Sequence, residues 1–222
     1  MRKALKEFLS NSRSMLIMFS IIWMLLFVTT LLDNKLATHI MLNSFHNPGL
    51  DVFFKLITYM GTLIPLGLGI AIVLLNIRKG WYIVLSQIFA FLITQPFKFG
   101  FAHKRPALLF HEHDVELPNV VNDVTLNTAC NSFPSGHTSA AFALFTCFIA
   151  ITPAKYRWLQ ITWLIMGWLV AYSRVYLSQH FAEDILFGSV IGVVASLLAY
   201  VCLYRKEWGE RPLFKRCKLN KK

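Results

Sequence analysis

Long apolar stretches separated by polar segments form the main pattern of the chain. There are six of them, near residues 15–32, 56–77, 81–97, 138–151, 158–172 and 185–204. A membrane-spanning helix needs about 17 to 25 residues. Only the fourth and fifth stretches are shorter, so we expect these two to extend into their flanks. The pattern therefore predicts an all-α fold, a bundle of six transmembrane helices.

The composition agrees with this class. With 56% hydrophobic residues, 15% charged residues and a mean hydropathy of +0.54, the chain resembles a membrane protein rather than a soluble domain. The four cysteines are scattered and offer neither a disulfide framework nor zinc spacing. The first apolar stretch follows basic residues, as a secretory signal does. It is long for a signal and no Ala-x-Ala site follows it, so we interpret it as a span.

The distribution of charge predicts the orientation. Six spans place both termini on one side, and that side then holds 16 of the 22 basic residues but only 3 of the 11 acidic ones. Because loops rich in lysine and arginine stay in the cytoplasm, we expect both termini there. Residues 1–14 and 205–222 would be basic cytoplasmic segments flanking a membrane domain at 15–204. The net charge of +11 then reflects topology, and no nucleic-acid partner is expected.

Three segments lie on the outer face in this topology, at 33–55, 98–136 and 173–184. The last one ends at the mouth of an apolar stretch and carries Arg174, His180, Glu183 and Asp184. Ionisable residues at such a place are costly and indicate a functional site. If the chain is already helical there, His180 and Asp184 share one face at i and i+4. A carboxylate could then hold the imidazole of an acid-base or nucleophilic histidine.

The segment at 98–136 is the longest connection, and its two ends carry the chemistry. At its finish, Pro134 to His137 predict a helix start, where Gly136 lets a ligand approach the backbone. Free N–H groups and the helix dipole attract an anion to such a position. Permanent positive charges would come from Lys98, Arg105 and Arg174, and arginine can bind phosphate oxygens in a bidentate way.

These segments together resemble the tripartite signature of the type 2 phosphatidic acid phosphatase superfamily. That signature reads Lys, six residues, Arg-Pro; then Pro-Ser-Gly-His; then Ser-Arg, five residues, His, three residues, Asp. In this chain the positions are Lys98 with Arg105-Pro106, Pro134 to His137, and Ser173-Arg174 with His180 and Asp184. Every signature position matches in order and spacing.

The resemblance implies a metal-independent hydrolase of phosphoric ester or anhydride bonds in membrane lipids, without a cofactor. His180 would be the nucleophile that forms a phosphohistidine, with Asp184 fixing its tautomer. His137 would protonate the leaving oxygen and later activate water. The nonbridging phosphate oxygens would be bound by Lys98, Arg105, Ser135, Gly136 and Arg174. Such a site would face the periplasm or the exterior of a bacterial inner (cytoplasmic) membrane.

The resemblance leaves the substrate open among undecaprenyl pyrophosphate, phosphatidylglycerol phosphate, phosphatidic acid and lipid A carrying a 1- or 4′-phosphate. Two other functions remain as alternatives. One is a lipid phosphotransferase that passes the same phosphoryl group to another lipid, and the other is a non-enzymatic transporter or scaffold. The sequence fixes neither the oligomeric state nor the Gram type of the organism.

Single residues have plainer interpretations. A lone interfacial histidine is usually a polar anchor, and Arg105 or Arg174 could simply extend to lipid headgroups. All of these plainer interpretations would have to hold at once, and at the spacing of the signature. We therefore favour a catalytic and phosphate-binding role for these residues.

Outside the signature, the outer loop contains His103, His111, Glu112, His113 and Asp114. They could ligate a metal, but they lack a rigid scaffold, and we expect a solvated loop. Lys104 is either a phosphate contact or an exposed lysine. Pro65, with glycines around it, predicts a kink in the second span.

Overall fold

A computed structural model describes residues 1–32 and 34–204 of the chain. The elements in order are α1 (Arg2–Leu32), α2 (Lys35–Leu42), α3 (Pro48–Ile57), η1 (Thr58–Gly61), α4 (Ile64–Leu75), α5 (Ile77–Gly100), α6 (Pro106–Glu112), α7 (Gly136–Ile151), η2 (Ala154–Tyr156), α8 (Arg157–Tyr176) and α9 (Ala182–Tyr204). The described part contains no strand, which confirms the all-α prediction. The predicted basic tail at 205–222 lies outside the described residues.

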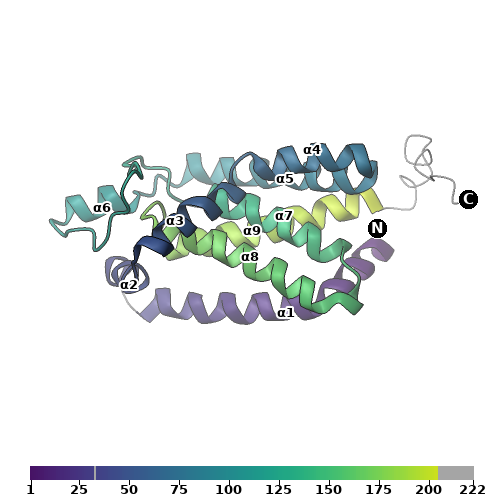
Figure 1. Cartoon of the computed structure of the whole chain (residues 1–222), viewed down its shortest axis with the longest axis horizontal. Coiled ribbons are helices and arrows are strands. Elements are labelled where there is room, and N and C mark those ends of the chain that lie inside the picture. Colours follow the sequence, from purple (N-terminus) through teal and green to yellow (C-terminus); the bar gives the residue numbers. More distant parts are fainter. Residues whose placement is uncertain (33, 205–222) are drawn as a thin grey trace, which may run out of the picture.

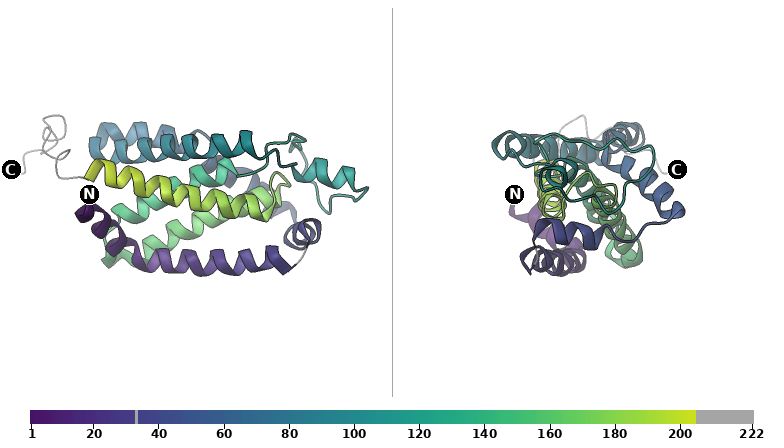
Figure 2. Two further views of the ribbon diagram at one scale, coloured as in Figure 1. Left: turned by 180° about the vertical axis from the view of Figure 1, so that it is seen from behind. Right: turned by 90° about the vertical axis from the view of Figure 1, so that its left-hand side faces the viewer.

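The long helices run side by side along the long axis of the molecule (Figure 1). The short helices α2 and α6 lie at one end of the bundle, whereas the N-terminus and the end of α9 lie at the opposite end. Helix α1 forms one side and the α4–α5 pair the other, with α7, α8 and α9 between them (Figure 2). Both ends of the described chain thus lie away from the connections that carry the signature residues.

Three helices, α1, α5 and α9, are long and apolar enough to cross a membrane. The α3–η1 segment and α4 together make a fourth candidate span, although they bend by 57° at a short break. Helix α7 is apolar but has only 16 residues, and α8 is not among the candidates. An integral membrane protein fits these apolar helices, while the number of six spans stays a prediction.

The second predicted span, at 56–77, is not one straight helix. Its apolar run is continuous in sequence, yet the chain leaves the helix after Gly61 and starts α4 at Ile64. Pro65 stands in the first turn of α4, where its missing N–H leaves no partner unsatisfied. The predicted kink at this proline is therefore present, and it divides the predicted span in two.

The segments that we predicted to lie on the outer face contain short helices. In the segment at 33–55, Asn34 and Asn47 cap α2 and α3, because their side-chain oxygens accept hydrogen bonds from Ala37 N (2.8 Å) and Leu50 N (2.9 Å). The segment at 98–136 is likewise not one loop, since α5 continues to Gly100 and α6 begins at a proline. Lys98 consequently lies in the last turn of a long helix rather than in a loop.

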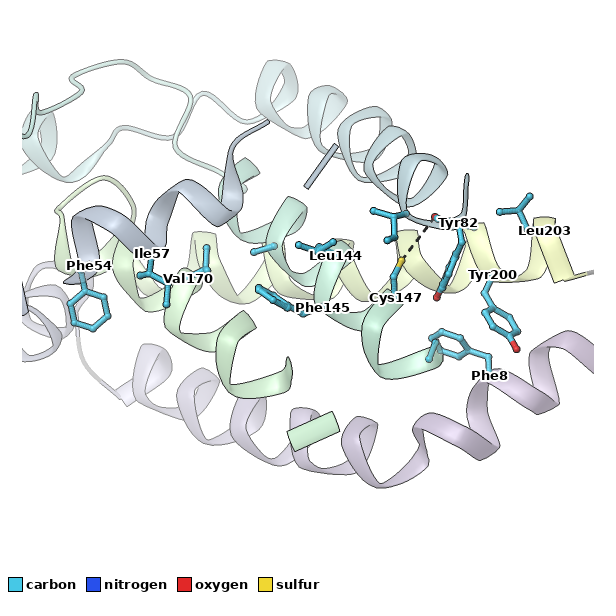
Figure 3. Packing of buried hydrophobic residues seen from close by; sticks show 14 of the residues in the cluster. Phe8, Phe54, Ile57, Tyr82, Leu144, Phe145, Cys147, Val170, Tyr200 and Leu203 are labelled. Atoms are coloured by element: carbon cyan, nitrogen blue, oxygen red, sulfur yellow. Dashed lines mark hydrogen bonds between the residues drawn. The ribbon is translucent and has the colours of Figure 1, made fainter. Parts of the chain in front are cut away.

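Helix α7 lies at the centre of the bundle, with 11 of its 16 residues buried. Figure 3 shows the surrounding cluster, in which Leu144 and Phe145 of α7 lie among side chains from α1, α5, α8 and α9. Two glycines let α9 pack closely on α7. A Cβ atom at Gly188 would lie 2.6 Å from the Ser135 carbonyl oxygen, and one at Gly192 would lie 2.5 Å from Phe142 Cβ. This packing fixes the start of α7 against the start of α9.

Candidate active site

The three signature segments converge at the end of the bundle opposite the chain termini. The backbone N–H of Ser135, before α7, donates to the Asp184 carbonyl oxygen of α9 at 2.9 Å. The guanidinium of Arg105 donates through Nη1 to the Gln179 carbonyl oxygen at 2.9 Å. Residues 49 and 74 positions apart in the sequence are thus joined directly. The predicted site residues from all three motifs form one cluster.

His180 and Asp184 form a buried pair. The His180 Nδ1 atom lies 3.4 Å from Asp184 Oδ2, and the two residues are 2% and 0% exposed. His180 precedes α9, which begins at Ala182. The i,i+4 contact therefore forms in the turn before the helix, where Asp184 Oδ2 also accepts the Phe181 N–H at 2.9 Å. One carboxylate oxygen both caps the turn and faces the imidazole.

Ser132 is part of this arrangement, and our sequence interpretation gave it no role. Its hydroxyl donates to Asp184 Oδ2 at 2.5 Å and lies 3.4 Å from His180 Nδ1. The side chain is fully buried, and its backbone N–H donates to the His103 carbonyl oxygen at 3.0 Å. The other carboxylate oxygen, Asp184 Oδ1, is buried without a partner among the described residues.

The surroundings keep the imidazole of His180 neutral. Burial lowers its pKa to about 4, although the neighbouring Asp184 carboxylate acts in the opposite direction. With Nδ1 facing the carboxylate, Nε2 is the nitrogen left for another partner. A neutral imidazole with one nitrogen oriented by a carboxylate has the form that a nucleophilic histidine requires.

Two buried guanidinium groups lie at the same site. Arg105 and Arg174 are each 7% exposed, and neither forms an ion pair with a carboxylate in the described ranges 1–32 and 34–204. Arg105 donates through Nε to Asn131 Oδ1 at 3.0 Å, and Arg174 donates through Nη1 to Thr58 Oγ1 at 2.7 Å. Burial lowers the pKa of Arg105, but a guanidinium stays protonated in proteins. The site therefore keeps an uncompensated positive charge, as an anion site needs.

Lys98 and Gly136 lie beside each other. A Cβ atom at Gly136 would be 3.8 Å from Lys98 Cε, and the Lys98 ammonium donates to the Asn131 carbonyl oxygen at 2.9 Å. His137, the second residue of α7, is near enough to Lys98 and both arginines for their charges to act on its ring. The lysine, the glycine and this histidine thus belong to the cluster.

The side chain of Ser135 is already hydrogen-bonded within the protein, unlike that of a free phosphate ligand. Its side-chain oxygen accepts hydrogen bonds from Thr138 N (3.3 Å) and Thr138 Oγ1 (2.9 Å), so it caps α7. Its side chain is fully buried, and its backbone N–H is used by Asp184. The structure gives Ser135 a structural role at the start of α7, and its predicted phosphate contact stays a prediction.

A possible metal-binding group differs from the one considered in the sequence. Among the described residues, the ligand atoms of His103, Glu183 and Asp184 lie within 4.8 Å of one another. Glu183 already pairs with Lys35. His111, Glu112, His113 and Asp114 are exposed, as we expected, but His111 and Glu112 belong to helix α6 rather than to a loop. Lys104 pairs with Glu112 at 2.5 Å, which agrees with an exposed lysine.

A mostly apolar groove of about 420 Å³ lies between η1, α4, α5 and α7. Apolar side chains such as Leu63, Leu66 and Phe91 line it, and it reaches Lys98 and Gly136. The groove therefore connects an apolar surface of the bundle with two of the predicted phosphate ligands.

Residues 79–208, more than half of the chain, match the sequence model of the PAP2 superfamily. The chain belongs to the PAP2 superfamily. This confirms the resemblance to the type 2 phosphatidic acid phosphatases, since the match covers all three signature motifs.

Phosphatases are among the named relatives of this PAP2 protein. A lipid A 4′-phosphatase of Porphyromonas gingivalis is 31% identical over 180 residues, which cover 75% of this chain and 72% of the relative. A lipid A 1-phosphatase of the same organism is 34% identical over 73 residues, which cover 33% of this chain but only 16% of that relative. These relatives support the prediction of a hydrolase acting on phosphoric esters.

A solved structure shows a similar fold. The crystal structure of Aquifex aeolicus LpxE aligns with a TM-score of 0.64 and 25% identity, covering 75% of this chain and 94% of that one. The arrangement of helices in this PAP2 protein is therefore shared with an experimentally determined relative over most of its length.

Proposed function

We propose that this PAP2 protein is a metal-independent lipid phosphate phosphatase that forms a phosphohistidine on His180. The observation that carries the proposal is the buried His180–Asp184 pair beside two arginines that lack carboxylate partners among the described residues. A neutral nucleophile and uncompensated cations are the two requirements for attack on a phosphate group.

In the first step, His180 Nε2 attacks phosphorus and the bond from phosphorus to the lipid oxygen breaks. The leaving oxygen takes the bond electrons and a proton from His137. Burial and the nearby cations lower the pKa of this ring to about 3 in the free protein, so the mechanism requires the bound phosphate to raise it. The hydrogen bond from Nδ1 to Asp184 stabilises the positive charge that develops on the ring of His180. In the second step, water attacks the phosphohistidine and gives its proton to His137. The N–P bond then breaks, which releases inorganic phosphate and restores neutral His180.

The nonbridging oxygens would be bound by the cations of the cluster. Arg105 and Arg174 reach the site from two different segments, so they can hold the phosphate from two sides. Lys98 and the backbone N–H of Gly136 would bind from the third side. Because these groups are held before substrate arrives, they stabilise the charge of the transition state with little reorganisation.

The apolar groove beside Lys98 and Gly136 supports a lipid as the substrate. A lipid could place its phosphate at the cluster and a hydrocarbon chain along the groove without leaving the bilayer. We propose six membrane spans in total, with residues 15–204 as the membrane domain and both termini in the cytoplasm. The site would then face the periplasm or the exterior of an inner membrane.

Among lipids, we propose a phosphate of lipid A as the first candidate, because both relatives described above are named lipid A phosphatases. Undecaprenyl pyrophosphate, phosphatidylglycerol phosphate and phosphatidic acid are the substrates to compare with it.

The test is phosphate release by the purified full chain in detergent with EDTA, using these four lipids and a His180→Ala variant. We expect release from one lipid by the wild type and none by the variant. A doubly phosphorylated lipid without free phosphate would instead show a phosphotransferase. Full activity of the His180→Ala variant would refute the assignment of the nucleophile.

A further inference from the structure

The break between α3 and α4 lies against the candidate site. At the start of the η1 turn, Thr58 Oγ1 accepts a hydrogen bond from Arg174 Nη1 at 2.7 Å. At its end, a Cβ atom on Gly61 would lie 2.6 Å from the His137 carbonyl oxygen and 2.9 Å from His137 Cβ. One turn of four residues thus contacts two predicted site residues, which come from α8 and α7.

The hydrogen bond to Thr58 orients Arg174 and leaves its positive charge available to an anion. Arg174 is buried, and a buried guanidinium needs acceptors to hold it in one orientation. Thr58 supplies a neutral acceptor, which fixes the group without cancelling its charge as a carboxylate would. The Nε atom of Arg174 is buried and has no partner in the described part of the chain. The hydroxyl of Thr58 is therefore a main restraint on the direction of the guanidinium.

The contact of Gly61 is one of backbone with backbone. The nearest atom to an added Cβ is the carbonyl oxygen of His137, which cannot move away as a flexible side chain could. The absence of a side chain at position 61 allows η1 to press on the first turn of α7. This contact limits where the Cβ atom of His137, and hence its imidazole, can lie.

We infer that Thr58 and Gly61 are positioning residues for phosphoryl transfer. Thr58 orients the guanidinium of Arg174 on the phosphate, and Gly61 fixes the general acid His137 against the leaving oxygen. This inference rests on the proposed function. Neither residue belongs to the signature motifs, and the break in the apolar run serves to bring both to the site.

Thr58 is tested with three variants assayed on the lipid that the wild type hydrolyses. Thr58→Val keeps the shape and removes the acceptor, and we expect kcat/KM to fall roughly 10- to 100-fold, as for a lost hydrogen bond to a charged group. Thr58→Ser should restore activity to within about threefold, because it retains the hydroxyl. Thr162→Val, in the same helix as Arg174, is the matched control and should not change the rate, because the Thr162 hydroxyl donates to the Trp158 carbonyl oxygen of its own turn.

The Thr58→Ser variant distinguishes the loss of the hydrogen bond to Arg174 from a change in packing. Wild-type activity in Thr58→Val would overturn the role of Thr58, and so would equal losses in the valine and serine variants. A wild type that releases no phosphate from any lipid would instead contradict the proposed function, so the two failures are distinguishable.

Gly61 is tested with two substrates that differ in their leaving group. In Gly61→Ala, we expect a loss of roughly tenfold or more on a lipid phosphate, whose poor leaving group needs a proton from His137. The loss on p-nitrophenyl phosphate should be several times smaller, because its leaving group departs without protonation. Gly67→Ala is the control, since no atom lies within 4 Å of its added Cβ. Equal losses on both substrates, or no loss, would overturn the role of Gly61.

Discussion

Two buried histidines lie close together at the end of the bundle opposite the chain termini, and their surroundings differ. His39 of α2 is 1% exposed, and its ring packs edge-to-face on Phe110 and Phe181. His180 is 2% exposed and faces Asp184. Burial lowers the pKa of both rings to about 4. Equal burial and equal pKa therefore do not distinguish a candidate nucleophile from a packed ring.

The difference lies in their partners. The Nε2 atom of His39 lies 3.3 Å from the Ser178 hydroxyl, and its Nδ1 atom has no partner among the described residues. His180 instead has a carboxylate on Nδ1 and two buried arginines nearby. Under the proposed function, the carboxylate and the two arginines without carboxylate partners among the described residues, rather than burial, distinguish His180 as the nucleophile. The predictions that follow test this comparison, beginning with the largest effect.

The same substitution at both histidines gives the strongest contrast. His180→Phe should reduce the rate of phosphate release roughly 10⁴-fold or more, because it removes the proposed nucleophile. His39→Phe should keep the rate within about tenfold, because phenylalanine preserves the aromatic packing. The measurement is the initial rate on one lipid phosphate, with a melting curve of each variant in detergent as a control for folding. Comparable losses at the two positions would remove the distinction between the two histidines.

Removing the charge of the carboxylate should weaken His180 without removing it. In Asp184→Asn, we expect kcat to fall roughly 10³- to 10⁴-fold with little change in substrate binding, because the amide neither holds the reactive tautomer nor stabilises its charge. Single-turnover rates and binding of a substrate analogue would check the two parts separately. If the rate does not change, Asp184 acts only as a cap on α9.

A smaller effect is expected at Ser132. Its hydroxyl donates to the same oxygen of Asp184 that faces His180, so Ser132→Ala should allow the carboxylate to rotate. We expect kcat to fall roughly tenfold, the size of one hydrogen bond to a charged group. Ser44→Ala is a suitable control, because the hydroxyl of Ser44 donates to the Met41 carbonyl oxygen in its own turn. A rate equal to that of the wild type would show that the turn before α9 holds Asp184 alone.

The mildest test uses pH. An unfolded histidine has a pKa near 6.5, while both buried rings titrate at about 4. Between these values the unfolded chain binds more protons than the folded one. Stability should therefore be complete above about pH 6.5 and fall as the pH drops towards 4. Melting temperatures between pH 7.5 and 4.5 measure this fall, which His39→Phe should reduce. The same slope in wild type and variant would contradict a neutral, buried His39.

Much of the cluster could be predicted from the sequence, because its ionisable residues stand out between apolar stretches. The signature includes Lys98, Arg105, Arg174, His180 and Asp184, and in the structure these residues lie in one cluster. The supporting hydroxyls could not be found in this way. Ser132 is 52 residues from Asp184, and Thr58 is 116 residues from Arg174. Ser132 lies in the connection before α7 and Thr58 in the η1 turn, and only the packing reveals that their hydroxyls meet charged groups.

The break in the second predicted span was hidden for a different reason. Residues on both sides of Gly61 are apolar, so the hydropathy pattern alone gives no sign of the bend. Pro65 indicated a kink, but a proline in the first turn of a helix does not show that the preceding turn leaves the helix axis. Asn34 and Asn47 are residues that favour helix caps, but the short helices that they begin do not appear as long apolar stretches.

The hydrogen bond from Ser135 N to the Asp184 carbonyl oxygen has a consequence for engineering. The spacing of His137 and His180 is determined by the register of α7 on α9, not by the length of the connection between α6 and α7. Grafts in the connection between Glu112 and Asn127 would need to keep its packed residues, since Val121 is 4% exposed and the Thr125 carbonyl oxygen accepts a hydrogen bond from Gln179 at 3.0 Å. An insertion of one residue between His180 and Asp184 would instead break the contact between these two side chains. It would also shift His180 relative to His137.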